Sequence, residues 1–98
     1  MFIEIVGDSA LIDQLDLDRD DVEEAITDAL GKDGQVTGAG IGLAADNPEW
    51  NLDVELEPDA AEGPAIARAA QALIRLGLGT VRIRPEGHQP RPATDLVS

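Results

Sequence analysis

Residues 50–57 read WNLDVELE, an alternation of apolar and polar side chains that is typical of a β-strand with one buried face. Residues 35–44 read QVTGAGIGLA and alternate in the same way, and residues 46–48 between the two runs form turns readily. The two runs therefore predict a β-hairpin. On the face opposite the predicted core, this register places Gly38, Gly40, Gly42, Asp53, Glu55 and Glu57.

A helix is predicted on each side of this hairpin. Before it, Asp18 is a suitable N-cap and Gly31 a suitable C-terminal stop, and the apolar residues between them recur at intervals of three and four. After it, residues 64–76 (PAIARAAQALIRL) repeat apolar side chains in the same manner, and Pro64 suits the first helical turn. Each helix is expected to bury one face against the sheet.

Two further strands are predicted near the ends of the chain. Residues 1–6 (MFIEIV) form the first and residues 80–84 (TVRIR) the last, while residues 7–16 are expected to be a connection with a partial turn. Beyond the last strand the chain is rich in proline and poor in apolar residues. We therefore expect a single α+β domain over residues 1–86 and a flexible C-terminal tail over residues 87–98.

The predicted order β-α-β-β-α-β resembles the ferredoxin-like split βαβ arrangement. The resemblance implies a four-stranded antiparallel sheet with two helices on one face. It also implies that the first strand lies between the third and the last, which places Glu4 within reach of an arginine, Arg82 or Arg84. Because this arrangement hosts many unrelated functions, it does not by itself indicate one.

The charge of the chain is large and unevenly distributed. The 98 residues hold 20 Asp and Glu against 7 Lys and Arg, a formal net charge of −13, and 18 of the acids lie in residues 1–62. Nucleic acids and anionic membranes are bound mainly through clustered positive charge, so both are disfavoured as partners. A basic protein is the favoured counterpart.

Few residues are suited to catalysis or to metal binding. Cysteine is absent, which excludes thiolate ligands and cysteine nucleophiles, and the single histidine, His88, lies in the predicted tail. We therefore predict no catalytic residue, no metal site and no cofactor, and expect that the protein is not an enzyme. Apolar runs are shorter than the roughly 20 residues of a membrane span, so a soluble, cytoplasmic protein is expected.

The candidate partner-binding residues are carboxylates of the first helix and of the hairpin, together with the only tryptophan. They are Asp20, Asp21, Glu24, Asp28, Asp53, Glu55, Glu57 and Trp50. Asp28 lies in the last helical turn and four residues after Glu24, a like-charge spacing that costs roughly 0.2 to 0.5 kcal/mol. Such a helix face indicates either a basic partner or a salt-rich cell interior that screens the repulsion. Trp50 packs in the core or, if exposed, anchors an interface.

Two functions are compatible with these features. The first is a small acidic, non-enzymatic binding protein that docks on a basic partner. In size and charge it resembles the small acidic inhibitors that neutralise toxins such as nucleases, which implies an immunity or antitoxin role. The alternative is a homo-oligomeric structural or small-ligand-binding regulatory module, such as a homodimer. It would pair through the strand that contains Gly38, Gly40 and Gly42, and its acidity would reflect a high-salt cytoplasm.

Overall fold

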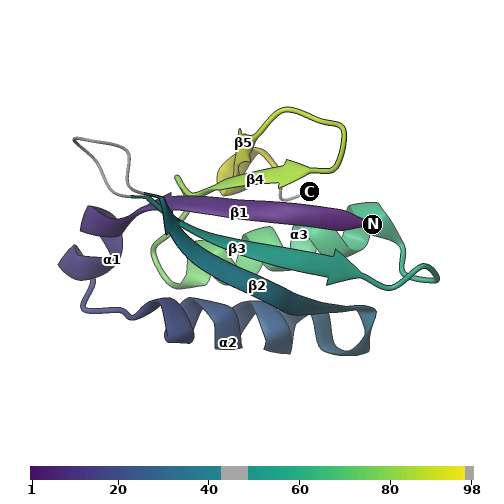
Figure 1. Ribbon diagram of the computed structural model, residues 1–98, viewed down its shortest axis with the longest axis horizontal. Coiled ribbons are helices and arrows are strands. Elements are labelled where there is room, and N and C mark those ends of the chain that lie inside the picture. Colours follow the sequence, from purple (N-terminus) through teal and green to yellow (C-terminus); the bar gives the residue numbers. More distant parts are fainter. Residues whose placement is uncertain (43–48, 97–98) are drawn as a thin grey trace.

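The computed structural model describes residues 1–42 and 49–96 and shows an α+β fold (Figure 1). One antiparallel sheet has the strand order β2-β3-β1-β4-β5. Its strands are β1 (Phe2–Asp8), β2 (Gly34–Gly42), β3 (Glu49–Leu56), β4 (Arg82–Pro85) and β5 (Arg91–Pro92). The helices are α1 (Ser9–Gln14), α2 (Arg19–Leu30) and α3 (Glu62–Arg75), with short 3-10 helices η1 (Gly31–Asp33) and η2 (Ala93–Asp95).

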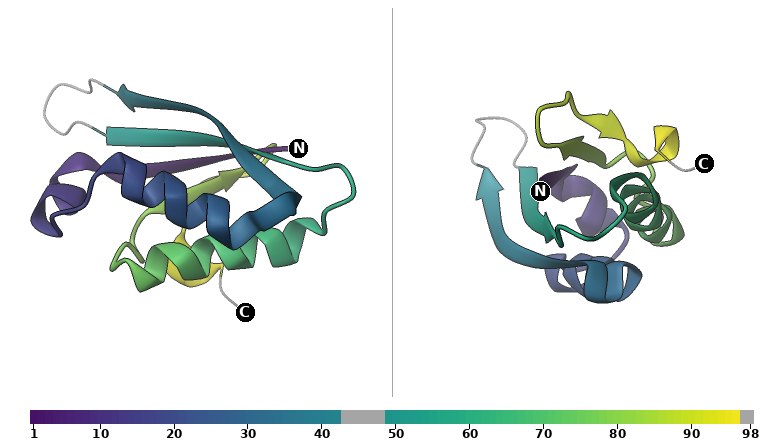
Figure 2. Two further views of the ribbon diagram at one scale, coloured as in Figure 1. Left: turned by 90° about the horizontal axis from the view of Figure 1, so that it is seen from below. Right: turned by 90° about the vertical axis from the view of Figure 1, so that its right-hand side faces the viewer.

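Helices cover one face of the sheet. In Figure 2, α2 and α3 lie side by side against that face, and no helix of the described residues covers the other, which we call the open face. As expected, β1 lies between β3 and β4, and β2 is an edge strand. The prediction of four strands and two helices is corrected to the five strands and three α-helices that residues 1–42 and 49–96 form.

The fifth strand comes from the proline-rich segment that was predicted to be a flexible tail. β5 pairs with β4, the Ala93 backbone N–H donates to the Val81 carbonyl at 2.9 Å, and the Thr94 N–H donates to the Gly79 carbonyl at 3.2 Å. Ala93 is completely buried. Backbone hydrogen bonds therefore hold residues 91–95 on the fold, although their side chains show no strand periodicity.

The third helix replaces the irregular connection predicted after the first strand. β1 continues through Gly7 to Asp8, so Gly7 does not end the strand as predicted. Asp8 then caps α1, because its Oδ1 accepts a hydrogen bond from the Ala10 N–H at 2.9 Å. Ile12 is the residue of α1 that is buried.

The helix predicted between Asp18 and Gly31 is confirmed as α2. The Asp18 backbone N–H donates to Asp21 Oδ2 at 2.9 Å, which satisfies one of the groups left free at a helix start. Gly31 adopts a φ of 57°, a conformation that L side chains rarely adopt, and ends the helix. Val22, Ile26 and Leu30 form the buried stripe.

The core is apolar, and among the described residues no polar or charged residue is buried in it. Trp50 is its one aromatic member, and the others are aliphatic.

The hairpin pairs Gly38 with Asp53 and Gly40 with Asn51, with a bulge at Thr37. The turn predicted at residues 46–48 lies outside the described residues. None of the described helices combines the length and the apolar character that a membrane crossing requires.

Candidate functional site

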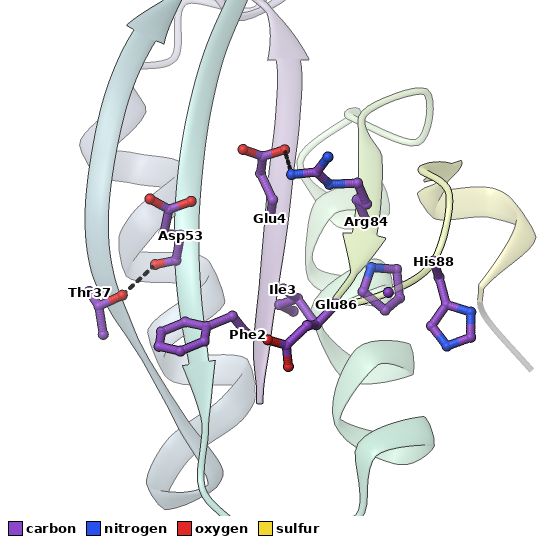
Figure 3. Close-up of a pocket in the computed structure, with 10 residues that line it drawn as sticks. Phe2, Ile3, Glu4, Thr37, Asp53, Arg84, Glu86 and His88 are labelled. Carbon is purple, nitrogen blue, oxygen red and sulfur yellow. Dashed lines mark hydrogen bonds and ion pairs between the residues drawn. The ribbon is translucent and has the colours of Figure 1, made fainter.

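A hollow of about 600 Å³ lies on the open face of the sheet (Figure 3). Side chains reach it from four adjacent strands, from Thr37 on β2 to Arg84 on β4, and from the turn that follows β4. Three strand spacings correspond to roughly 14 Å. The hollow is therefore a trough that crosses the strands rather than a groove along one of them.

Strand register brings the central residues of this hollow together. Glu4 of β1 is directly opposite Asp53 of β3 on one side and Arg84 of β4 on the other. The Thr37 hydroxyl donates to the Asp53 backbone carbonyl at 3.3 Å, which holds the bulge of β2 against β3. Glu4, Asp53 and Arg84 alternate with buried residues along their strands, so they all project from the open face.

The turn after β4 adds the other wall. The Glu86 backbone N–H donates to the Phe2 carbonyl at 3.0 Å, and the His88 N–H donates to the Pro85 carbonyl at 3.0 Å. Gly87 between them has a φ of 79°, which a glycine adopts without strain. This turn places Glu86 beside Phe2 and His88 at the outer rim of the hollow (Figure 3).

The hollow has an uncompensated negative charge. Its lining contains three carboxylates and one guanidinium, which gives a formal charge of −2 with His88 neutral. Glu4 is paired with Arg84 at 2.9 Å, as the strand order implied. Asp53 and Glu86 have no ion-pair partner among the described residues, so two carboxylates remain free to bind a cation.

An exposed aromatic ring lies on the open face near these carboxylates, beside Glu86 and below Asp53 in the view of Figure 3. Phe2 is 49% exposed, more than any other large apolar side chain among residues 1–42 and 49–96. An aromatic side chain in this position leaves roughly half of its surface in water, which is unfavourable in the isolated protein. Aromatic rings surrounded by polar groups are frequent anchors of protein interfaces.

The structure separates the predicted partner-binding carboxylates into two groups. Asp20, Asp21, Glu24 and Asp28 are exposed on α2, which lies on the helical side of the sheet. Asp53 is exposed in the hollow, Glu55 is half-buried on the same open face, and Glu57 is exposed just after β3. The two groups therefore lie on opposite sides of the molecule.

The acidic surface of α2 lacks an apolar anchor. Its shallow depression of about 280 Å³ is lined only by Asp20, Glu23, Glu24 and Thr27. Asp28 faces a second groove that it shares with Arg75 of α3. Within the described ranges, no three Asp, Glu or His side chains are close enough together to hold a metal ion.

Trp50 is removed from the candidate partner-binding surface. Its side chain is 1% exposed and packs on the core side of β3, whereas Asn51 and Asp53 project from the opposite face of the strand. A partner cannot contact the indole while the protein is folded. Of the two interpretations of Trp50, the core residue is confirmed.

The predicted pairing strand is β2, and it contains Gly38, Gly40 and Gly42. In the part of the chain that the structure describes, β2 pairs only with β3, so its outer edge is free. Its nine residues, GQVTGAGIG, include no charged side chain and no proline. At the opposite edge of the sheet, β5 is only two residues long.

Sequence reasoning did not find the part of the site that the turn after β4 supplies. Glu86 and His88 belong to an irregular segment, which the pairing of β4 with β1 and two backbone hydrogen bonds bring to the open face. The spacing of residues along one strand contains no signal for such a contact. Comparison with protein-family models, with curated proteins and with solved structures gave no match to this chain, so the residues of the hollow themselves are the basis for its function.

Proposed function

We propose that this protein is a non-enzymatic binding protein that docks on a basic protein partner through the open face of its sheet. One observation supports this proposal above the others. The exposed ring of Phe2 lies beside Asp53 and Glu86, two carboxylates without an ion-pair partner among the described residues, in a hollow of formal charge −2. Apolar contact and charge complementarity are thereby available at one place.

The carboxylates of α2 have a different role in this proposal. They lie on the other side of the molecule, where Asp20 and Glu24 line a depression without an apolar side chain and Asp28 borders a groove lined mostly by small or aliphatic residues with no aromatic ring. We assign to them the long-range attraction of a basic protein rather than the contact. A small inhibitor that covers the positive cleft of a toxin, such as a nuclease, would use both effects. An immunity or antitoxin role is the specific form of the proposal.

We also infer that the fold is a ferredoxin-like unit with additions. The strand order β2-β3-β1-β4 and the two long helices on one face support this description. α1 and β5 extend the unit at the end of β1 and beside β4. The addition of β5 matters for the proposed function because the segment that leads to it includes Glu86, Gly87 and His88, which line part of the hollow.

The test compares two variants that remove the same charge from opposite sides. Asp53→Asn with Glu86→Gln removes two charges from the open face, and Asp20→Asn with Glu24→Gln removes two from α2. Proteins captured from the native host are identified and purified, and their affinity for each variant is measured at low and at high salt. We expect the open-face variant to lose the partner and the α2 variant to retain it with slower association. Loss with the α2 variant alone, or with neither, would contradict the proposal.

A second candidate function is supported by the edge strand. In a chain with 28% charged residues, nine consecutive uncharged residues at a free sheet edge suit pairing with a second copy. Ala39 is exposed on this strand, and Ala39→Lys places a charge there without a buried contact. If the protein is a homo-oligomeric module, light scattering should detect a dimer, and Ala39→Lys should dissociate it. A wild-type protein that stays monomeric at high concentration would remove this candidate.

A further inference from the structure

We propose that the hollow of the open face binds the guanidinium group of an arginine side chain of the partner. The guanidinium, which has hydrogen-bond donors and no acceptor, would stack on the ring of Phe2. Its N–H groups would donate hydrogen bonds to the carboxylates of Asp53 and Glu86. This inference rests on the proposed function for the source of the arginine. The chemistry of the hollow, however, can be tested without any partner.

The charge of the hollow excludes an anionic ligand and favours a cationic one. Its only guanidinium, that of Arg84, is already engaged with Glu4 at 2.9 Å. An anion would therefore meet Asp53 and Glu86 with no free positive charge to bind it. A cation would find two carboxylates and would leave the one ion pair of the hollow, Glu4–Arg84, intact.

The exposed ring favours a guanidinium over an ammonium group. A guanidinium is planar and weakly hydrated, so it loses little when it stacks on an aromatic face, and its N–H groups remain in the plane to bond carboxylates at the side. An ammonium is compact and strongly hydrated. Phe2 provides the face, Glu86 lies beside it, and Asp53 lies above it in the view of Figure 3.

The shape of the hollow suits a side chain delivered by a protein. It extends across four strands and is open to solvent along the sheet, so a ligand in it remains connected to the outside. Pro85, opposite Ile3 in the β1–β4 register, adds apolar surface to the lining, which suits the methylene stem of an arginine.

The inference is tested with N-acetyl-arginine amide as the probe, titrated into ¹⁵N-labelled protein and followed by NMR. The matching lysine and citrulline derivatives are the controls, since citrulline keeps the planar shape of arginine without its charge. We expect saturable shifts of the amides of Phe2, Asp53 and Glu86 with arginine, weaker binding of lysine and none of citrulline. Equal binding of citrulline, or shifts confined to α2, would overturn the inference.

Substitutions in and near the hollow should change the affinity for arginine in defined directions. Phe2→Leu keeps an apolar side chain without the aromatic face and should weaken arginine binding about two- to fivefold. Asp53→Asn should weaken it by a similar factor, whereas Glu57→Gln, outside the hollow, should leave it unchanged. Arg84→Gln releases the Glu4 carboxylate and should strengthen binding. Weaker binding by Arg84→Gln would overturn the inference, because it would indicate that Arg84 itself holds the ligand.

The two proposals fail in different ways. Saturable arginine binding at the hollow without capture of a basic protein would support the guanidinium site and overturn the docking function. Capture of a basic protein that depends on Asp53 and Glu86, without arginine binding, would support the docking function and overturn the guanidinium site. The probe titration and the capture experiment therefore answer separate questions.

Discussion

The indole of Trp50 occupies the space that any side chain at Gly7 would need. A Cβ placed on Gly7 would lie 2.4 Å from Cζ2 of Trp50, closer than carbon atoms of real side chains approach one another. The two residues are directly opposite in the β1–β3 register, and Trp50 is 1% exposed. The absence of a side chain at position 7 is therefore what allows the only tryptophan to fill the core at this end of the sheet.

Gly7→Ala should destabilise the protein by about 1 to 3 kcal/mol, because the added methyl group overpacks a core that is already filled. The measurement is the free energy of unfolding in urea, followed by circular dichroism. Gly63→Ala is the control: it lies in the exposed first turn of α3, and apart from its chain neighbours no atom lies within 4 Å of the added Cβ. It should therefore cost less stability than Gly7→Ala. Equal stability of the Gly7→Ala and wild-type proteins would refute the packing argument.

The position of a charge along α2 should decide its effect on stability. Asp28 lies in the last turn, where the helix dipole opposes a negative charge, and Asp20 lies in the first turn, where the dipole favours it. Asp28→Lys should therefore stabilise the protein relative to Asp20→Lys by about 1 kcal/mol, although both make the same change in net charge. Urea unfolding at low salt measures the difference. The same stability for both variants would mean that only the net charge matters.

The C-terminal segment should contribute to the stability of the whole domain. Ala93 is completely buried, so Ala93→Asp places a charge in the core without a partner and should cost about 3 kcal/mol or more. Gln89→Asp adds the same charge at an exposed position of the same segment and should have little effect. Thermal unfolding of both variants checks this. If Ala93→Asp unfolds at the wild-type temperature, residues 91–95 do not pack as described.

Added salt should stabilise this chain more than a variant with fewer carboxylates. With a formal net charge of −13, like charges repel one another across the surface, and salt shortens the range of that repulsion from about 10 Å at 0.1 M to about 3 Å at 1 M. The variant Asp20→Asn, Glu24→Gln, Asp28→Asn should be more stable at low salt and gain less from NaCl. If NaCl changes the stability of the variant and of the wild type equally, the repulsion arises elsewhere on the surface.

The parts of the fold that could be predicted from sequence are those with a local signal. Asp18 and Gly31 bound α2 because capping is decided within a few residues, and the alternation in residues 50–57 follows from the burial of one face of β3. Gly7 was misinterpreted as a strand end because glycine commonly interrupts strands. The reason for this glycine, the ring of Trp50, lies more than forty residues away in the chain.

The candidate site was predictable only in its sheet residues. The strand order implied that Glu4 pairs with an arginine, and the alternation of β3 placed Asp53 on the open face. Glu86 reaches Phe2 through a backbone hydrogen bond, and η2, which follows β5, is held by backbone hydrogen bonds to residues 79 and 81. Contacts of this kind depend on the path of the main chain and leave no pattern in the side chains.

The burial of Trp50 also gives the protein an optical label for its own folding. The chain contains no tyrosine. Absorption at wavelengths longer than those of phenylalanine therefore comes from this one indole, and so does the fluorescence that is excited there. Its environment is set by the core, on the side of β3 away from the hollow. A red-shifted emission spectrum would therefore signal that the domain has opened, and an unchanged spectrum during a titration would show that the bound molecule leaves the interior intact.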